Sequence, residues 1–160
     1  DFPMCDFRLI GGNRKQIAYY RDMAEKLGVG NIRVFLRQGY NRISYYQCKA
    51  DILIAFWSVY VPTMNYCSPL KLFEYLQTGN SILVHDFPVL HEVLPDSPLI
   101  ALASPTDTGE AREALKNLLQ SNVQPKTRAQ LKNYGNRFTY DARARQLLDG
   151  FDRVEQTRTG

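Results

Sequence analysis

Apolar and polar positions alternate along this chain in two patterns, which predict a regular succession of strands and helices. Short, nearly continuous apolar runs predict buried strands at 6–12, 31–38, 50–57, 80–86 and 98–104. Between these runs, apolar residues recur at helical spacing and end at glycine or polar residues. This second pattern predicts helices at 14–27, 41–49, 68–79 and 87–94, and three more after the last strand, at 107–119, 126–134 and 140–154.

The alternation predicts an α/β fold, a doubly wound, Rossmann-like parallel sheet with helices on both faces and a helical C-terminal tail. Continuous apolar strands are typical of sheets that helices cover on both faces. The length of 160 residues fits one domain, which we expect at 1–155, followed by a frayed tail at 156–160. Ligands of such sheets bind beyond the carboxyl ends of the strands, at helix N-termini.

The stretch from Tyr66 to Gly79 (YCSPLKLFEYLQTG) has the pattern of a short helix with defined ends. Ser68 suits the N-cap, because its hydroxyl can accept a hydrogen bond from the first turn. Pro69 suits the first helical position, where its missing N–H costs nothing. Gly79 can adopt the left-handed conformation of a C-cap.

Lys71 and Glu74 suggest what this helix does. A cation in the first turn opposes the helix dipole, and it makes sense if a phosphate binds the N–H groups there. Glu74 lies one turn further on the same side, within reach of a hydroxylated group attached to that phosphate. The alternative is a solvated ion pair between the two side chains, which stabilises a surface helix. The position of the helix, after the strand that ends at Trp57, favours the phosphate.

Composition and charge exclude several classes of protein. The hydrophobic fraction of 44% and the charged fraction of 22% are ordinary for a globular domain. The net charge is +4, but the lysines and arginines are scattered, so we expect no nucleic-acid partner, whereas a basic patch facing phosphate or anionic lipid stays open. Three cysteines without CxxC spacing favour a reducing compartment. The sequence predicts neither a membrane span nor a signal peptide.

Several familiar site motifs are missing from the sequence. There is no GxxxxGK[ST], GxGxxG, HExxH or Asp-x-Asp, which argues against a P-loop enzyme, a dinucleotide site, metal-dependent hydrolysis and a magnesium-bound pyrophosphate. We interpret Gly11 and Gly12 first as a tight turn. His85, His91 and Glu92 are expected to have structural roles.

The run SPLKLFEYLQTGNSILVHDFPVLHEVL resembles the C-terminal, donor-binding domain of retaining glycosyltransferases of the GT-B fold (glycosyltransferase family 4, or group 1 type), which use nucleotide-sugar donors. The resemblance covers most of the chain. LIGG, VFLRQG, the segment Tyr46–Ile54 and the run Phe138-Thr139-Tyr140 follow in the family's order.

The resemblance implies a role for each matching residue. Glu74 would bind the ribose hydroxyls, and the backbone around Leu70 and Lys71 would hold the diphosphate. The loop Arg37–Gly39 would lie near the base. No metal or other cofactor is expected, because the helix terminus and cationic side chains can stabilise a diphosphate leaving group, and no catalytic residue is assigned. The predicted donor-binding residues are Gly12, Arg37, Gln38, Gly39, Tyr66, Ser68, Pro69, Leu70, Lys71 and Glu74.

Two departures from the family pattern matter. Tyr66 occupies the position, eight residues before Glu74, at which the family often carries an acidic residue that contacts the donor sugar. The family's pyrophosphate-binding Arg and Lys precede anything that resembles LIGG, so we expect a fragment that lacks them, the first strand–helix unit and the N-terminal acceptor domain. Such a fragment would be inactive alone.

The whole protein is therefore expected to be a cytoplasmic hexosyltransferase that builds a surface or lipid-linked glycan, with retention and without metal. Its expected partners are a nucleotide-sugar donor and a glycan or lipid-linked acceptor, and contact with the inner membrane face stays open. Two alternatives remain, because a fold does not determine a function. One is a non-catalytic interaction module whose aromatic loop Tyr60–Tyr66 binds a protein. The other is a sugar-nucleotide epimerase of the same fold.

Overall fold

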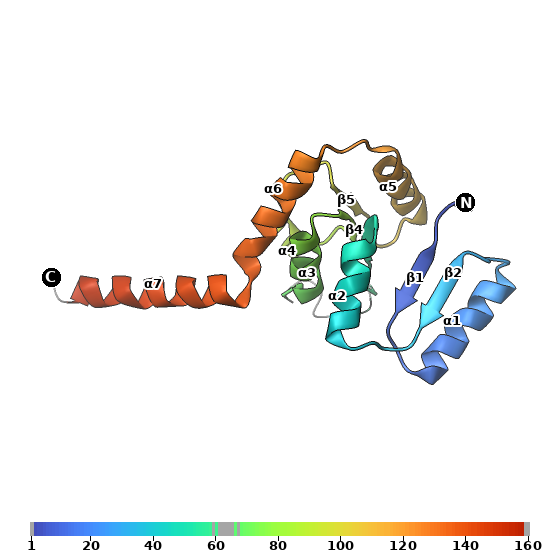
Figure 1. Ribbon diagram of the computed structural model, residues 1–160, viewed down its shortest axis with the longest axis horizontal. Helices are drawn as coiled ribbons and strands as arrows, with labels where there is room; N and C mark the ends of the chain where they lie inside the picture. Colours follow the sequence, from blue (N-terminus) through green and yellow to red (C-terminus); the bar gives the residue numbers. More distant parts are fainter. Residues whose placement is uncertain (1, 59, 61–65, 67, 159–160) are drawn as a thin grey trace. The chain divides into compact units, whose positions relative to one another are not determined.

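The computed structural model has a mixed α/β fold, in which parallel strands form two sheets flanked by helices (Figure 1). It describes residues 2–58, 60, 66 and 68–158, without the side chains of 152 and 154–158. The chain divides into two compact units, 1–49 and 50–160. The predicted α/β class with parallel strands is confirmed. The strands form two sheets rather than one, since the hydrogen-bonded ladders in the described part join β1 only to β2 and β3 only to β4.

The first unit is a βαβ unit followed by one helix. Its elements are β1 (Phe7–Ile10), α1 (Arg14–Lys26), β2 (Ile32–Phe35) and α2 (Tyr40–Lys49). The strands pair in parallel, with Phe7 opposite Ile32, and such a pair needs a crossover such as α1. The side chain of Asn13 accepts a hydrogen bond from the Gln16 N–H at 3.0 Å, and that of Gln16 accepts one from the Asn13 N–H at 2.8 Å. This capping box explains where α1 begins.

The second unit contains the remaining strands and helices. Its elements are β3 (Ile52–Ala55), α3 (Leu70–Thr78), β4 (Ser81–His85), α4 (Pro88–His91), β5 (Ile100–Ala103), α5 (Thr108–Gln120), α6 (Pro125–Gly135), the 3-10 helix η2 (Asn136–Phe138) and α7 (Tyr140–Arg158). The strand order is β3-β4-β5, and both pairs are parallel. The three carboxyl ends therefore share one edge of the sheet. Helix α7 continues past its predicted end at 154 to Arg158.

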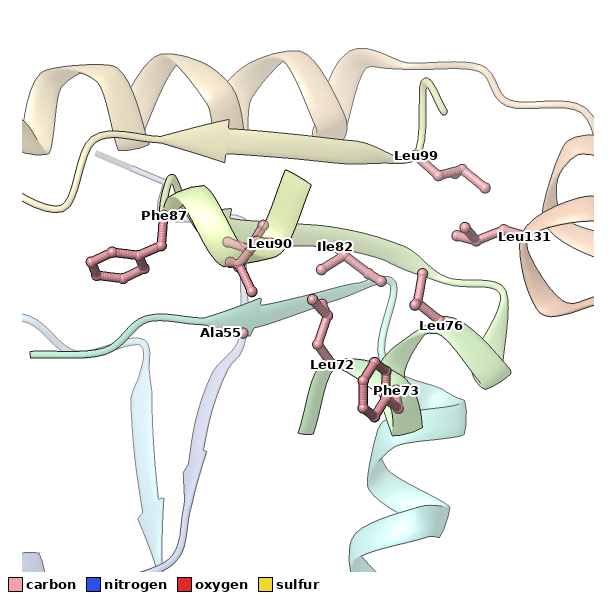
Figure 2. Close-up of a cluster of buried hydrophobic side chains, with 10 residues drawn as sticks. Ala55, Leu72, Phe73, Leu76, Ile82, Phe87, Leu90, Leu99 and Leu131 are labelled. Atoms are coloured by element: carbon pink, nitrogen blue, oxygen red, sulfur yellow. The ribbon is translucent and has the colours of Figure 1, made fainter. Parts of the chain in front are cut away.

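The core of the second unit lies where α3, α4 and α6 meet the sheet. Figure 2 shows Leu72 and Leu76 of α3 gathered with Ile82 of β4 and Leu131 of α6. Leu72, Leu76 and Ile82 are fully buried. Strand β4 is buried at four successive positions, Ser81–Val84, as its continuous apolar run predicts for a central strand.

Helices α3 and α6 approach each other so closely that glycine is required at the contact. A Cβ atom on Gly135 would lie 2.6 Å from the backbone N of Gln77 and the backbone C of Leu76. At the end of α3, Gly79 has φ +74°, and a Cβ there would lie 2.6 Å from the backbone O of Arg128. The opposing atoms belong to the backbone, which cannot give way as a side chain can. These two glycines therefore set the distance between the helices.

His85, the last residue of β4, contacts the backbone that follows the carboxyl end of β3. Its Nδ1 atom lies 3.2 Å from the backbone N and 3.0 Å from the backbone O of Trp57. Its ring stacks on Phe56, with the ring centroids 4.1 Å apart. Burial lowers the pKa of His85 below its ordinary value of 6.5, and the hydrogen bond with the Trp57 backbone only partly opposes this.

We predict that Gly135→Ala lowers the free energy of unfolding by roughly 1–3 kcal/mol, because the methyl group must push two helices apart. Gly150→Ala in α7 is the matched control, since a Cβ there meets nothing within 4 Å. That change removes a helical glycine and should add about 0.5–1 kcal/mol. Urea unfolding of both variants measures the difference. Equal urea midpoints for the two variants would show that the close contact does not affect the free energy of unfolding.

We also predict that the chain loses stability as the pH falls from 6.5 through the folded pKa of His85. The folded state binds the proton less readily than the unfolded state, so acid favours unfolding in this window, and the full stability is present above pH 6.5. His85→Phe should reduce this pH dependence. The measurement is urea unfolding between pH 5 and pH 7.5, and an unchanged slope in the variant would contradict the assignment.

Candidate functional site

The candidate site is built around the first turn of α3, which begins one residue later than predicted. Pro69 is the N-cap, with ψ 69° and no side-chain cap, and its carbonyl accepts hydrogen bonds from the N–H groups of Leu72 (2.8 Å) and Phe73 (3.3 Å). The predictions of Ser68 as the N-cap and Pro69 as the first helical residue are therefore wrong. Pro69 is buried and lies outside the helix. Ser68 therefore precedes the N-cap position by one residue and cannot cap α3. Gly79 is the left-handed C-cap, as predicted.

The first turn of α3 combines an apolar anchor with an exposed surface. Leu72 and Phe73 are buried in the core, whereas Leu70 and Lys71 are exposed. The Lys71 ammonium lies over the indole ring of Trp57, with Nζ 5.8 Å from the ring centroid. Because Trp57 follows β3, this contact places the start of α3 beside the carboxyl end of that strand.

Glu74 lies one turn after Lys71 and is half-buried. The neighbouring Tyr75 donates a long hydrogen bond, 3.5 Å, to the carbonyl of Ile54 in β3. Burial, with a contribution from the charge of Glu74, raises the pKa of Tyr75 to about 12. The Tyr75 phenol is thus neutral at physiological pH and anchors this turn to the sheet.

The carboxyl end of β4 contributes a second polar group. His91 Nε2 lies 2.6 Å from Asp86 Oδ1, and both side chains are exposed. The contact of His85 with the Trp57 backbone agrees with the structural role expected for it. Glu92 is the exposed C-cap of α4. In the described part of the chain, no three His, Cys, Asp or Glu side chains are grouped to hold a metal ion.

Four predicted residues lie in the first unit, at the carboxyl edge of its own sheet. Gly12 has φ +81°, as its interpretation as a turn requires, and its carbonyl accepts a hydrogen bond from the Arg37 N–H at 3.3 Å. Gln38 donates to the Leu36 carbonyl at 2.8 Å and accepts from the Arg42 guanidinium at 3.1 Å. The loop 37–39 is therefore held against the turn that follows β1.

Next to this loop lies a cavity of about 450 Å³ that the sequence analysis did not find. Arg14, Ile17 and Arg21 of α1 line it with Val34 and Phe35 of β2. The Arg21 guanidinium donates a hydrogen bond to the Val34 carbonyl at 3.1 Å. The lining residues are spread over a helix and a strand, so no local motif indicates the cavity.

The loop before α3 is described only in part. Tyr60 and Tyr66 are exposed, while 59, 61–65 and 67 lie outside the described residues. The interaction loop predicted at Tyr60–Tyr66 therefore falls largely outside them. None of the helices among the described residues is both long enough and apolar enough to cross a membrane.

The sequence analysis also missed an aromatic group at the carboxyl edge of the second sheet. Phe56 and Trp57 follow β3 directly, and Phe87 follows β4 after Asp86. The rings of Trp57 and Phe87 meet edge to face, with centroids 6.5 Å apart. In the sequence, the group is indicated by aromatic residues within two positions of the ends of two apolar strands.

No family model matches the sequence, and no curated protein does. Several solved structures are similar to the chain. WaaG, a glycosyltransferase involved in lipopolysaccharide biosynthesis, matches with a TM-score of 0.62 and 21% identity, over 84% of this chain and 34% of WaaG. Sucrose-phosphate synthase from Thermosynechococcus elongatus matches with a TM-score of 0.69 and 15% identity, over 95% of this chain and 39% of the synthase.

AviGT4, a glycosyltransferase involved in avilamycin A biosynthesis, matches with a TM-score of 0.56 and 15% identity, over 89% of this chain and 43% of AviGT4. This chain thus spans between 34% and 43% of the length of the three proteins. At identities of 15–21% the likeness establishes the fold. The chain has the Rossmann-like fold of the C-terminal domain of GT-B glycosyltransferases.

Proposed function

We propose that this chain is the donor-binding half of a glycosyltransferase, which moves a sugar from a nucleotide-sugar to an acceptor in glycan biosynthesis. Two of the similar structures, WaaG and AviGT4, are named as glycosyltransferases of biosynthesis. The observation that carries the proposal is the exposed Lys71 at the start of α3, beside the carboxyl end of β3. In an open α/β sheet, ligands bind outside this edge.

The first turn of α3 is the proposed diphosphate site. The dipole of α3 favours an anion at this end of the helix, while the N–H groups of Leu70, Leu72 and Phe73 donate to the carbonyls of Ser68 and Pro69. The Lys71 ammonium adds a full charge on an exposed stem. Together they would stabilise the diphosphate as it leaves the sugar, in the role that a metal ion has in other enzymes. The sugar would then transfer with retention, as the acceptor hydroxyl attacks from the side of the leaving group.

Glu74 is the proposed ribose ligand. A carboxylate can accept hydrogen bonds from two hydroxyl groups at once, and its position one turn after Lys71 fits a ribose attached to the diphosphate. Tyr66 would face the donor sugar in place of the family's acidic residue.

The acceptor is proposed to bind a further domain, because the similar proteins are more than twice as long as this chain. The whole enzyme would be a cytoplasmic hexosyltransferase that acts on a glycan or lipid-linked acceptor. The 160-residue chain would bind its donor without transferring sugar.

We expect the chain to bind UDP, GDP or ADP weakly, and Glu74→Ala to reduce the affinity about 10-fold or more, the value of a charged hydrogen bond. Equilibrium dialysis measures binding, and circular dichroism checks the fold. Glu113→Ala, in an exposed ion pair with Lys116 on α5, is the control and should bind as the original chain does. Absence of binding to all three nucleotides at millimolar concentration would contradict the proposal.

Lys71→Met separates the phosphate site from the ion-pair alternative. If Lys71 contacts the diphosphate, the affinity for the nucleoside diphosphate falls about 10-fold while that for the nucleoside is unchanged, and the salt dependence of binding weakens. A surface ion pair with Glu74 predicts instead a loss of roughly 0.5 kcal/mol in the free energy of unfolding, with no change in affinity. Lys116→Met on α5 is the control for the loss of a surface lysine.

A further inference from the structure

We propose that Trp57 is a positioning residue, whose indole ring holds the Lys71 ammonium beside the start of α3 both in the empty site and when a nucleotide is bound. This inference rests on the proposed function of Lys71. Its starting point is the 5.8 Å distance between Lys71 Nζ and the centroid of the Trp57 ring, which lies within the range of a cation–π attraction.

Trp57 is well placed to act as a fixed support. Its backbone N and O atoms lie 3.2 and 3.0 Å from Nδ1 of His85, at the end of the central strand β4. Its ring is partly buried against the core and meets Phe87 edge to face. His85 therefore restrains the backbone of Trp57, and Phe87 and the core restrain its ring. The lysine that the ring faces is exposed.

Lys71 needs such a support because its side chain is long and flexible. A lysine on a four-carbon stem loses much rotational freedom when a ligand immobilises it, and this loss weakens binding. A ring that already confines the ammonium near the start of α3 reduces that loss, as preorganisation does in general. The indole contributes no charge of its own and only has to keep the amine within reach.

The same contact is compatible with a bound diphosphate. An ammonium has three N–H donors, so Lys71 can donate to a phosphate while it stays beside the ring. An exposed cation–π contact favours this placement of the amine by about two- to five-fold. A ligand bound there changes the surroundings of Trp57, which is the one tryptophan in the sequence and can report on binding.

The test is a double-mutant cycle of Trp57→Leu and Lys71→Met, read as the affinity for the nucleoside diphosphate that the chain binds most tightly. Trp57→Leu should weaken this affinity about two- to five-fold when Lys71 is present. It should have no further effect in the Lys71→Met background. Trp57→Phe retains an aromatic face and should recover part of the loss. Phe151→Leu, which removes an exposed ring on α7, is the matched control and should leave the affinity unchanged.

A second measurement follows the amine itself. In the chain with ¹³C-methylated lysines, the Lys71 methyl signals, assigned with Lys71→Arg, should lie upfield because of the indole ring current. Saturation with the nucleoside diphosphate should leave them upfield of the signals of the other lysines and change the tryptophan fluorescence. This experiment needs no variant of Trp57, so it holds even if Trp57→Leu does not fold.

The outcomes separate the two proposals. If Trp57→Leu weakens binding equally in both backgrounds, or if the Lys71 signals move to the positions of the other lysines on binding, the positioning role is wrong while the donor site stands. If no nucleoside diphosphate binds in dialysis, the proposed function fails and the positioning role fails with it. Coupling in the cycle together with Lys71 signals that stay upfield on binding supports both.

Discussion

The close backbone contact between α3 and α6 is the constraint on which the candidate site depends. Gly135 lets α6 approach the last turn of α3, and Gly79 lets the chain leave α3 beneath α6. Between these points, Leu76 and Leu131 share the core with Ile82 of β4. Since one face and one end of α3 are fixed in this way, its first turn has a defined place at the edge of the sheet. A site made of a helix start needs such support, because backbone N–H groups act only where the helix points.

The carboxyl edge of the second sheet is unusual in its combination of aromatic and charged residues. Rings from Phe56, Trp57, His85 and Phe87 contact one another there, and an exposed ammonium lies over one of them. The rings come from the ends of two adjacent parallel strands, so the ladder between β3 and β4 sets their spacing. The result is an apolar surface with an exposed cation over it.

The likeness to much longer glycosyltransferases concerns the fold. The similar structures share at most 21% identity with the chain, so what is retained is the order and direction of strands and helices. Such a scaffold presents helix starts and strand-end loops at one edge, and individual side chains there decide the chemistry. In this chain the predicted diphosphate and ribose residues occupy one short helix, and the predicted base-binding residues occupy the edge of a separate sheet.

The sequence by itself determined the local elements. Among the described residues, continuous apolar runs predicted the five strands and helical spacing predicted the α-helices. Gly79 was identified as a C-cap because a glycine can adopt the left-handed conformation that ends α3. These features depend on residues a few positions apart. Tertiary structure decided what depends on distant residues: the burial of Pro69 that moves the start of α3, the contact of Lys71 with Trp57, and the need for glycine at position 135. It also decided that the strands form two sheets. Strand pairing joins segments that are distant in the sequence, and a periodic pattern does not show which strand pairs with which.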